Sequence, residues 1–311
     1  MASFLITGMA GGLAKLVAER LVGRGDEVVG VDYRPVPPLA GALAGVKVYQ
    51  ANYNKTIIED VFKQHRFDAV LHLGRVGNLK VSIGKRFDLN VVGSQKIMDL
   101  CVTHGVRRLT VLSTFHIYGA DPTNHVPIVE TDPLHAGTSL PQLADAIQLD
   151  SMACIWAYRH PEVRTVVLRP ANVIGRTIRN AMSTLLRGRR VPHVLGFNPM
   201  VQLVDAGDLA AAVLAAVASE RTGIYNVAGA DAAPWCTILE LARARTFPVP
   251  SSLIRLYLRA ATDSPAYLMD YFKYPCIISD AAFRKDFSWS PRIPLADSIW
   301  DTVAEARDAG A

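Results

Sequence analysis

Two glycines and an alanine stand at three-residue spacing near the start of the chain, in "FLITGMAGGLAKLVAERL". Gly8 allows a tight turn, Gly11 lets the backbone approach a bound group closely, and Ala14 allows close packing of a helix on a strand. An apolar run precedes them and a helical pattern follows, so free N–H groups at a helix N-terminus would face an anion such as a pyrophosphate. The spacing predicts a dinucleotide site, although such a triplet also occurs in ordinary turns.

An acidic residue closes the second apolar run, at Asp32 in "VVGVDYRP". A carboxylate there would accept hydrogen bonds from an adenosine ribose diol and repel a 2′-phosphate. Arg34 lies two residues further on and offers a cation that a 2′-phosphate could use. The pattern therefore favours NAD as the cofactor, with NADP less favoured and not excluded.

Thr114 and His116 lie two positions apart after the apolar run "RLTVL". On a strand, side chains two positions apart point to the same face, so a strand that continued this far would bring both to one site. A positioned imidazole beside a hydroxyl can move a proton. The alternatives are ordinary: Thr114 as a strand-end hydroxyl that bonds the backbone, and His116 as a polar loop residue.

Further candidates for proton transfer lie nearby, at Asp145, Asp150 and His135. An aspartate with an ordinary pKa of about 4 is a weak base unless burial raises that pKa. A solvated helix face is the alternative for Asp145 and Asp150.

The elements that must position these groups alternate between strand and helix. Short apolar runs, typical of strands covered on both faces of a parallel sheet, occur at "SFLIT", "EVVGVD", "VKVYQA", "AVLHLG", "RLTVLS" and "RTVVLRP". Helical patterns such as "LAKLVAERLVGRG" separate them. We therefore predict an α/β fold with a doubly wound parallel (Rossmann) sheet.

The pattern loosens after Pro170, which predicts a smaller C-terminal lobe. We expect residues 1–171 to form the dinucleotide-binding domain, with 200–228 returning to it. Residues 172–199 and 229–311 are then the substrate-binding lobe.

Composition limits the functional classes. The net charge is +5 and no block of lysine and arginine is long enough to follow a nucleic-acid backbone, so no nucleic acid is expected. The cysteines are far apart and form no CxxC pair, which predicts reduced thiols and no metal site. The run at 209–218 is too short for a bilayer, and the start lacks a signal-peptide pattern. We expect a soluble, cytoplasmic protein without a membrane partner.

Seven segments together resemble one superfamily: the glycine triplet, "FDAVLHLG", "DLNVVGSQKIMDLC", "GVRRLTVLSTFHIYG", "RTVVLRPANVIG", "GIYNVAG" and "FRKDFSWSPR". In order and spacing they are similar to the extended short-chain dehydrogenase/reductases, and within these to the NAD-dependent epimerase/dehydratase branch. The resemblance runs from residue 4 to about residue 295. It is nearest to an atypical subgroup without the Tyr-x-x-x-Lys pair of that branch.

The resemblance implies a set of site residues. Thr114 matches the catalytic Ser/Thr, with Asp145 and His116 as speculative proton carriers. Cofactor-binding residues are implied at Gly8, Met9, Ala10, Gly11, Gly12, Leu13, Asp32, Tyr33, Arg34, Ala51, Asn52, Tyr53, Leu73, Gly74, Arg75, Asn90, Ser113, Pro170, Asn172 and Val173. Substrate-binding residues are implied at Thr114, Phe115, His116, Asn172, Arg179 and Arg187.

The proton carrier of the family is missing. There a Tyr moves the proton, and a Lys one helical turn later lowers the pKa of that Tyr. The corresponding segment offers Gln142 with Ala146, or Leu143 with Ile147, depending on register. No lysine lies between Lys96 and Lys273, and none of the ten tyrosines has a lysine four residues later. Proton transfer by such a Tyr is therefore not expected.

The substrate side also departs from the family. Arginines at 176, 179, 187, 189 and 190 suit phosphate recognition, or form a solvated basic surface. Relatives that use nucleotide sugars have an Arg and a His where this chain has Val201 and Asp205, so the usual diphosphate clamp is absent.

Three functions stay open: an NAD-dependent epimerase/dehydratase or oxidoreductase with an altered acid/base, a non-catalytic dinucleotide sensor or interaction protein, and an assembly scaffold. The first acts by hydride transfer on a small hydroxyl or carbonyl substrate, phosphorylated or nucleotide-linked. A small-molecule substrate and a homodimer are the expected partners.

Overall fold

A computed structural model describes residues 1–78, 81–254, 256 and 266–308. Within them, seven parallel strands form the main sheet in the order β10-β6-β5-β4-β1-β2-β3. Their bounds are β1 (Ser3–Thr7), β2 (Glu27–Asp32), β3 (Lys47–Gln50), β4 (Ala69–His72), β5 (Arg108–Leu112), β6 (Arg164–Pro170) and β10 (Gly223–Val227). The predicted doubly wound parallel sheet is confirmed.

Strand order reverses beside β1, since the chain runs outward through β2 and β3 and then returns to β4 on the other side. In open α/β sheets the carboxyl ends of the strands at such a reversal flank the ligand crevice. The ends of β1, β2, β4 and β5 carry the predicted site residues. The topology therefore fixes where the site is assembled.

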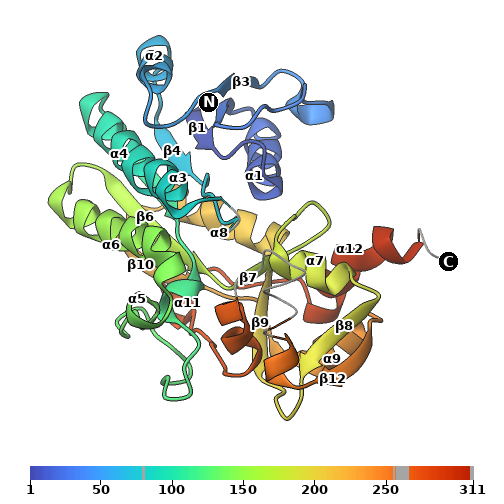
Figure 1. Cartoon of the computed structure of the whole chain (residues 1–311). Coiled ribbons are helices and arrows are strands. Elements are labelled where there is room, and N and C mark those ends of the chain that lie inside the picture. The colour runs from blue at the N-terminus through green and yellow to red at the C-terminus, as the bar shows by residue number, and fades with distance from the viewer. Residues whose placement is uncertain (79–80, 255, 257–265, 309–311) are drawn as a thin grey trace.

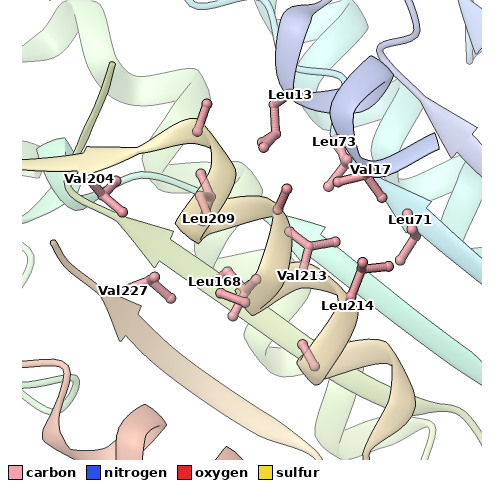
Figure 2. Close-up of a cluster of buried hydrophobic side chains, with 14 of the residues drawn as sticks. Leu13, Val17, Leu71, Leu73, Leu168, Val204, Leu209, Val213, Leu214 and Val227 are labelled. Atoms are coloured by element: carbon pink, nitrogen blue, oxygen red, sulfur yellow. The ribbon is translucent and has the colours of Figure 1, made fainter. Parts of the chain in front are cut away.

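Helices cover both faces of the sheet (Figure 1). One face packs on α1 (Gly12–Val22) and α8 (Ala206–Ala218), and the other packs on α4 (Gly93–Thr103) and α6 (Ala144–Arg159), with α2 (Thr56–Gln64) nearby. Figure 2 shows α8 against the sheet, where Val213 and Leu214 lie near Leu71 of β4 and Val17 of α1. Burial of α8 between α1 and the sheet accounts for its nearly continuous apolar sequence.

The described part of the chain contains no helix with both the length and the apolar character to cross a membrane.

Smaller sheets lie beside the main one, at the lower right of Figure 1. Within the described residues one has the order β11-β9-β7 and the other pairs β12 with β8. Their bounds are β7 (Asn172–Ile174), β8 (Arg190–Val194), β9 (Met200–Asp205), β11 (Ala232–Pro234) and β12 (Arg245–Val249). Helices α7 (Ala181–Arg187), α9 (Trp235–Leu241) and α12 (Leu295–Asp308) share their core.

The remaining described elements are short. They are η1 (Gly41–Leu43), α3 (Ile83–Phe87), η2 (Asp88–Val92), η3 (Phe115–Tyr118), α5 (Ala136–Ser139), η4 (Pro141–Leu143), η5 (Ala266–Phe272) and α11 (Ala281–Phe287). The aromatic-rich stretch "LYLRAATDSPAYLMDYFKYP", residues 256–275, is the segment that could offer partner contacts in the scaffold interpretation, and its residues 257–265 lie outside the described residues. The division into a dinucleotide-binding domain and a substrate lobe stays a prediction.

Candidate active site

The turn from β1 to α1 is one that only glycine can make. Gly8 has φ +80°, and a Cβ added to it would lie 2.6 Å from the Cα of Gly74, at the end of β4. The Gly11 N–H donates to the Gly8 carbonyl (2.8 Å) and closes the turn. No side chain caps the N-terminus of α1, which begins at Gly12. The first N–H groups of α1 are therefore available to an anion, as the sequence predicts.

Asp32, at the end of β2, is completely buried. Its carboxylate accepts hydrogen bonds from the N–H groups of Ala10 (2.9 Å) and Arg34 (2.9 Å). The Arg34 side chain, half exposed, also donates to it, with Nε 3.2 Å from Oδ1. The carboxylate thus lies against the glycine turn, and the half-exposed Arg34 side chain is its partner on the solvent side. A ribose diol could take that outer place.

A buried polar chain supports the floor of this turn. His72 Nδ1 lies 2.8 Å from Thr7 Oγ1, and His72 Nε2 lies 2.7 Å from Ser94 Oγ. Burial lowers the pKa of His72 to about 4, so the ring is neutral and serves one hydroxyl as donor and the other as acceptor. The Tyr53 hydroxyl accepts the Gly8 N–H (3.1 Å), and burial raises the pKa of that hydroxyl. His72 and Tyr53 therefore hold the glycine turn from below.

These observations test whether a dinucleotide would fit. A glycine turn with no room for a Cβ, an uncapped helix N-terminus and a buried carboxylate at the next strand end are the features that a pyrophosphate and a ribose require. Thr177 adds a contact that no sequence signal indicates: a Cβ on Gly12 would lie 2.5 Å from its carbonyl oxygen. The residues present fit the cofactor.

Thr114 and His116 meet directly after β5. The Thr114 side chain is buried, and its Oγ1 lies 2.8 Å from His116 Nδ1. The reason differs from the sequence-based one, because β5 ends at Leu112 and residues 115–118 form the 3₁₀ turn η3. Thr114 is the N-cap of that turn, and its side chain also accepts the His116 N–H (3.4 Å). A helix cap, not a strand face, brings hydroxyl and imidazole together.

The imidazole of this pair is neutral. Burial, and then the positive charge of Arg75, lower the pKa of His116 to about 3. Tyr271 in η5 packs its ring 5.0 Å from the imidazole and donates its hydroxyl to the His116 carbonyl (2.6 Å). The Phe115 ring packs beside the imidazole at an interplanar angle of 46°, with ring centroids 4.2 Å apart. Tyr271 is far away in the sequence, and no spacing signal predicts its place here.

Asp145 lies in a buried ion pair. Its Oδ1 accepts Arg86 Nη1 (2.9 Å) and its Oδ2 accepts Asn90 Nδ2 (2.6 Å). Asn90 in turn bonds both main-chain groups of Val76, with the Val76 N–H donating to Oδ1 (2.8 Å) and Nδ2 donating to the carbonyl (3.0 Å). Gln142, where the resemblance implies the family's Tyr, is exposed. Asp145 therefore clamps the loop that follows β4.

A second buried ion pair ties α6 to β6. Arg169 donates to Asp150 through Nε (3.0 Å) and Nη2 (2.6 Å), and the Tyr118 hydroxyl accepts Arg169 Nη1 (2.8 Å). The Ser113 hydroxyl donates to Asp150 (2.5 Å). Ser113 is thus bound to this network beneath the end of β5.

Three of the five arginines of the predicted substrate side are engaged within the protein. Arg187 donates to the carbonyls of Thr302, Ile178, Gly175 and Arg176. Arg176 and Arg179 form exposed ion pairs with Asp301 (3.0 Å) and Glu305 (3.8 Å). The roles of Arg179 and Arg187 toward a substrate stay predictions.

The other predicted site residues are found around the same strand ends. Buried side chains are those of Met9, Leu13, Ala51, Tyr53, Leu73 and Asn90. Asn52 Oδ1 accepts the Asn54 N–H (3.3 Å), and Asn172 and Val173 lie in β7, partly buried. Pro170 is buried at the end of β6, and Tyr33 is partly buried after β2. In the described residues no group of His, Cys, Asp and Glu side chains is arranged to hold a metal ion.

Comparison with known proteins places this site in context. Residues 4–228 match the model of the NAD dependent epimerase/dehydratase family. An uncharacterized protein of Mycobacterium tuberculosis is 25% identical over 305 residues, which cover 93% of this chain and 77% of the relative. A UDP-glucose 4-epimerase of Streptomyces lividans is 28% identical over 277 residues, which cover 88% of this chain and 72% of the relative.

A solved structure agrees with the fold. The Thermus thermophilus UDP-glucose 4-epimerase in complex with NAD superposes with a TM-score of 0.78 at 22% identity, over 99% of both chains. At 22% sequence identity, this structural similarity shows the fold alone.

Proposed function

This chain belongs to the NAD-dependent epimerase/dehydratase family, and we propose that it binds NAD and transfers a hydride between that cofactor and a hydroxyl or carbonyl group of a small substrate. The observation that carries the catalytic part is the Thr114–His116 pair, with its 2.8 Å contact after β5, on the far side of β4 from the glycine turn. It supplies a hydroxyl and a neutral imidazole at the strand end where the family has its reacting groups.

The cofactor would be held by three features. The N–H groups at the start of α1 would bind the pyrophosphate, and Gly8 and Gly74 would let the backbones of β1 and β4 approach it. Asp32 would accept hydrogen bonds from the adenosine ribose diol once the Arg34 side chain moves aside. NAD, when bound, supplies the hydride acceptor or donor.

Thr114 and His116 would move the proton. The Thr114 hydroxyl would contact the substrate hydroxyl and pass its proton to the imidazole. A neutral imidazole can accept a proton at one ring nitrogen and release one from the other, so the pair can relay a proton without remaining charged. A neutral imidazole N–H can also polarise a carbonyl, as in enzymes whose catalytic histidine has a lowered pKa. Buried Asp145 would act on the loop and not on the substrate.

The relatives support a phosphorylated or nucleotide-linked substrate, because the curated match from Streptomyces lividans is a UDP-glucose 4-epimerase. Val201 and Asp205 stand against the family's usual way of holding the diphosphate, since an isopropyl group cannot replace a bidentate cation. We therefore propose a substrate of this broad class, bound through other contacts.

The first experiment is calorimetric titration of nucleotide-stripped protein with NAD and NADP, beside Asp32→Ala. We expect micromolar NAD binding that the substitution abolishes, and weaker NADP binding. Absence of binding to either cofactor would overturn the proposal. A panel of sugar nucleotides and hydroxy acids, followed by the near-ultraviolet absorbance of NADH, then tests catalysis.

A second function, a non-catalytic NAD sensor, is favoured by one observation. Where the resemblance implies Tyr and Lys, the chain has exposed Gln142 in η4 with buried Ala146 in α6, or buried Leu143 with partly buried Ile147, depending on register. NAD binding without any substrate-dependent absorbance change, and unaffected by Thr114→Val, would favour the sensor.

A further inference from the structure

We propose that Arg75 is the substrate-anion residue of this site, and that the part of the substrate that carries the reacting hydroxyl or carbonyl group also carries a carboxylate. Arg75 follows Gly74 at the carboxyl end of β4, between the glycine turn and the Thr114–His116 pair. The inference rests on the proposed function, which it deepens by naming the charge of the substrate.

The Arg75 guanidinium carries a charge that is not paired directly, although the charge of Asp145 acts on it. The Arg75 side chain is partly buried, yet within residues 1–78, 81–254, 256 and 266–308 no hydrogen bond or ion pair is found for its guanidinium. Burial lowers the pKa of Arg75, but arginine remains protonated in proteins. A guanidinium has five donors, and those of Arg75 are open to solvent or to a ligand, since none of its nitrogens is both buried and unpaired. Such a group is expected to find an anion when the site is filled.

The loop that carries Arg75 is held rigidly. Val76, the next residue, is bonded through both main-chain groups to Asn90, and Asn90 donates to Asp145. Asn90 lies in the π-helical turn η2, a rare geometry that is frequent at functional sites. The guanidinium is therefore placed by a fixed backbone, and a flexible surface arginine would not be held in this way.

Its neighbours place it on the reacting side of the site. His72 of β4 pairs with Val111 of β5, so Arg75 and Thr114, each three residues further along, lie at the same edge of the sheet. The charge of Arg75 lowers the pKa of His116, and the charges of Asp145 and Arg86 act on Arg75. The pyrophosphate position lies instead at the start of α1, where the main-chain N–H groups supply the donors. Arg75 is thus in reach of a group bound beside the imidazole.

The charge balance favours a carboxylate over a phosphate. Arg86 is neutralised by Asp145 at 2.9 Å, so this ion pair offers no second cation. One guanidinium matches one carboxylate in charge and, through its two parallel N–H groups, in shape. A phosphate dianion would need a further cation. The single unpaired charge of Arg75 therefore matches a singly charged anion next to the reacting carbon.

Binding of such an anion would also change His116. Burial is the larger cause of its lowered pKa and Arg75 the second, so pairing Arg75 with a carboxylate removes the second cause. The imidazole then becomes a better proton acceptor only when the substrate is present.

The test measures how fast phenylglyoxal modifies each arginine, by mass spectrometry of peptides from the wild-type protein. Glycolate and its neutral isostere glycolamide are the probes, each added in the absence and presence of NAD. We expect glycolate to slow modification of Arg75 several-fold and glycolamide to leave it unchanged. Arg245, exposed in β12, is the internal control and should react at one rate throughout.

Each other outcome overturns the proposal. Protection by NAD alone, with none added by glycolate, would assign Arg75 to the cofactor's phosphates. Equal protection by both probes would exclude charge recognition, and no protection would exclude an anion site.

Thermal unfolding gives an independent readout. Glycolate should raise the Tm of the wild type and of Arg245→Gln but not of Arg75→Gln, and a rise in all three would contradict the proposal. Failure of NAD to bind in calorimetry would overturn the proposed function, whereas the glycolate measurements without NAD would still report on Arg75.

Discussion

The Asp32 carboxylate is satisfied twice, by the glycine turn on its inner side and by Arg34 on its outer side. The inner bond comes from a main-chain N–H and persists whatever is bound. The outer bonds come from a half-exposed side chain, and ion pairs of that kind contribute ~1 kcal/mol or less. Displacing Arg34 is therefore a minor cost of cofactor binding.

Removing Arg34 tests this balance. We expect Arg34→Ala to raise the affinity for NAD by about fivefold at most, because the competing ion pair is lost. The affinity for NADP should fall, since the cation nearest a 2′-phosphate is lost. Calorimetry with both cofactors measures the two effects, and a large loss of NAD affinity would contradict the displacement.

The two histidines of the site should stay neutral in mildly acidic solution. Imidazole resonances followed by NMR across a pH series should show His72 and His116 still neutral at pH 5, since their pKa values lie near 4 and near 3. Arg75→Gln should raise the pKa of His116 and leave that of His72, since Arg75 acts only on the first. An unchanged pKa of His116 in Arg75→Gln would mean that Arg75 lies too far from the imidazole to affect its titration.

At the scale of elements, the glycine turn and its neighbour strand are one unit. Gly8→Ala combines a positive φ with a contact at 2.6 Å to the Cα of Gly74, just after β4, whereas Gly25→Ala has a similar φ (+81°) and nothing within 4 Å. The control should cost ~1 kcal/mol, the penalty of the left-handed conformation alone. Gly8→Ala should cost clearly more and abolish NAD binding. Urea unfolding and calorimetry measure both, and equal costs would contradict the packing argument.

A buried ion pair between Arg86 and Asp145 joins α3 to α6. Arg86→Met should lower the free energy of unfolding by about 3–5 kcal/mol, because it leaves Asp145 buried without its cation. The double substitution Arg86→Met with Asp145→Leu should recover much of that loss, since no charge is then stranded. Urea unfolding of the wild type, Arg86→Met, Asp145→Leu and the double variant completes the cycle. If the losses in the free energy of unfolding are additive, the two side chains are not coupled.

The stability of the whole molecule should depend on pH through His72. The unfolded side chain has a pKa of about 6.5, and the folded one has a pKa of about 4. Between these values the unfolded chain binds more protons, so stability falls as the pH falls. The loss attributable to His72 should reach about 2 kcal/mol by pH 5. His116 acts in the same direction but is partly exposed and contributes less.

Urea unfolding at pH 7.5 and at pH 5 checks this expectation. His72→Gln should flatten the difference between the two pH values, whereas His104→Gln, at an exposed position after α4, should keep it. If both variants lose the same stability between pH 7.5 and pH 5, the acid sensitivity belongs to other groups.

The sheet and the glycine turn could be predicted from sequence because their signals are local. Strands covered on both faces appear as continuous apolar runs, and Gly8 and Asp32 follow their strands directly. The fold class follows from those signals, and the family from the resemblance of seven segments of the chain to known sequences.

The contacts that complete the site have no local signal. Thr177 over Gly12 and Tyr271 on His116 join segments far apart in the sequence, and only tertiary packing brings them together. His116 reaches Thr114 through a 3₁₀ turn that Thr114 caps, and not through the continued strand that would also have placed both side chains on one face. The partners of Asp145 were equally unpredictable, since α3 and α6 meet only in the folded chain.

Sheet order has a consequence for synthesis. β10 is the edge strand beside β6, yet residues 171–222 lie between them in the chain. As the polypeptide leaves the ribosome, β6 is made while its outer partner does not yet exist. The nascent chain must then carry an open, apolar strand edge until residues 223–227 emerge, and such edges invite pairing with other chains. A pause in translation within this interval should therefore make the protein depend on chaperones for its yield.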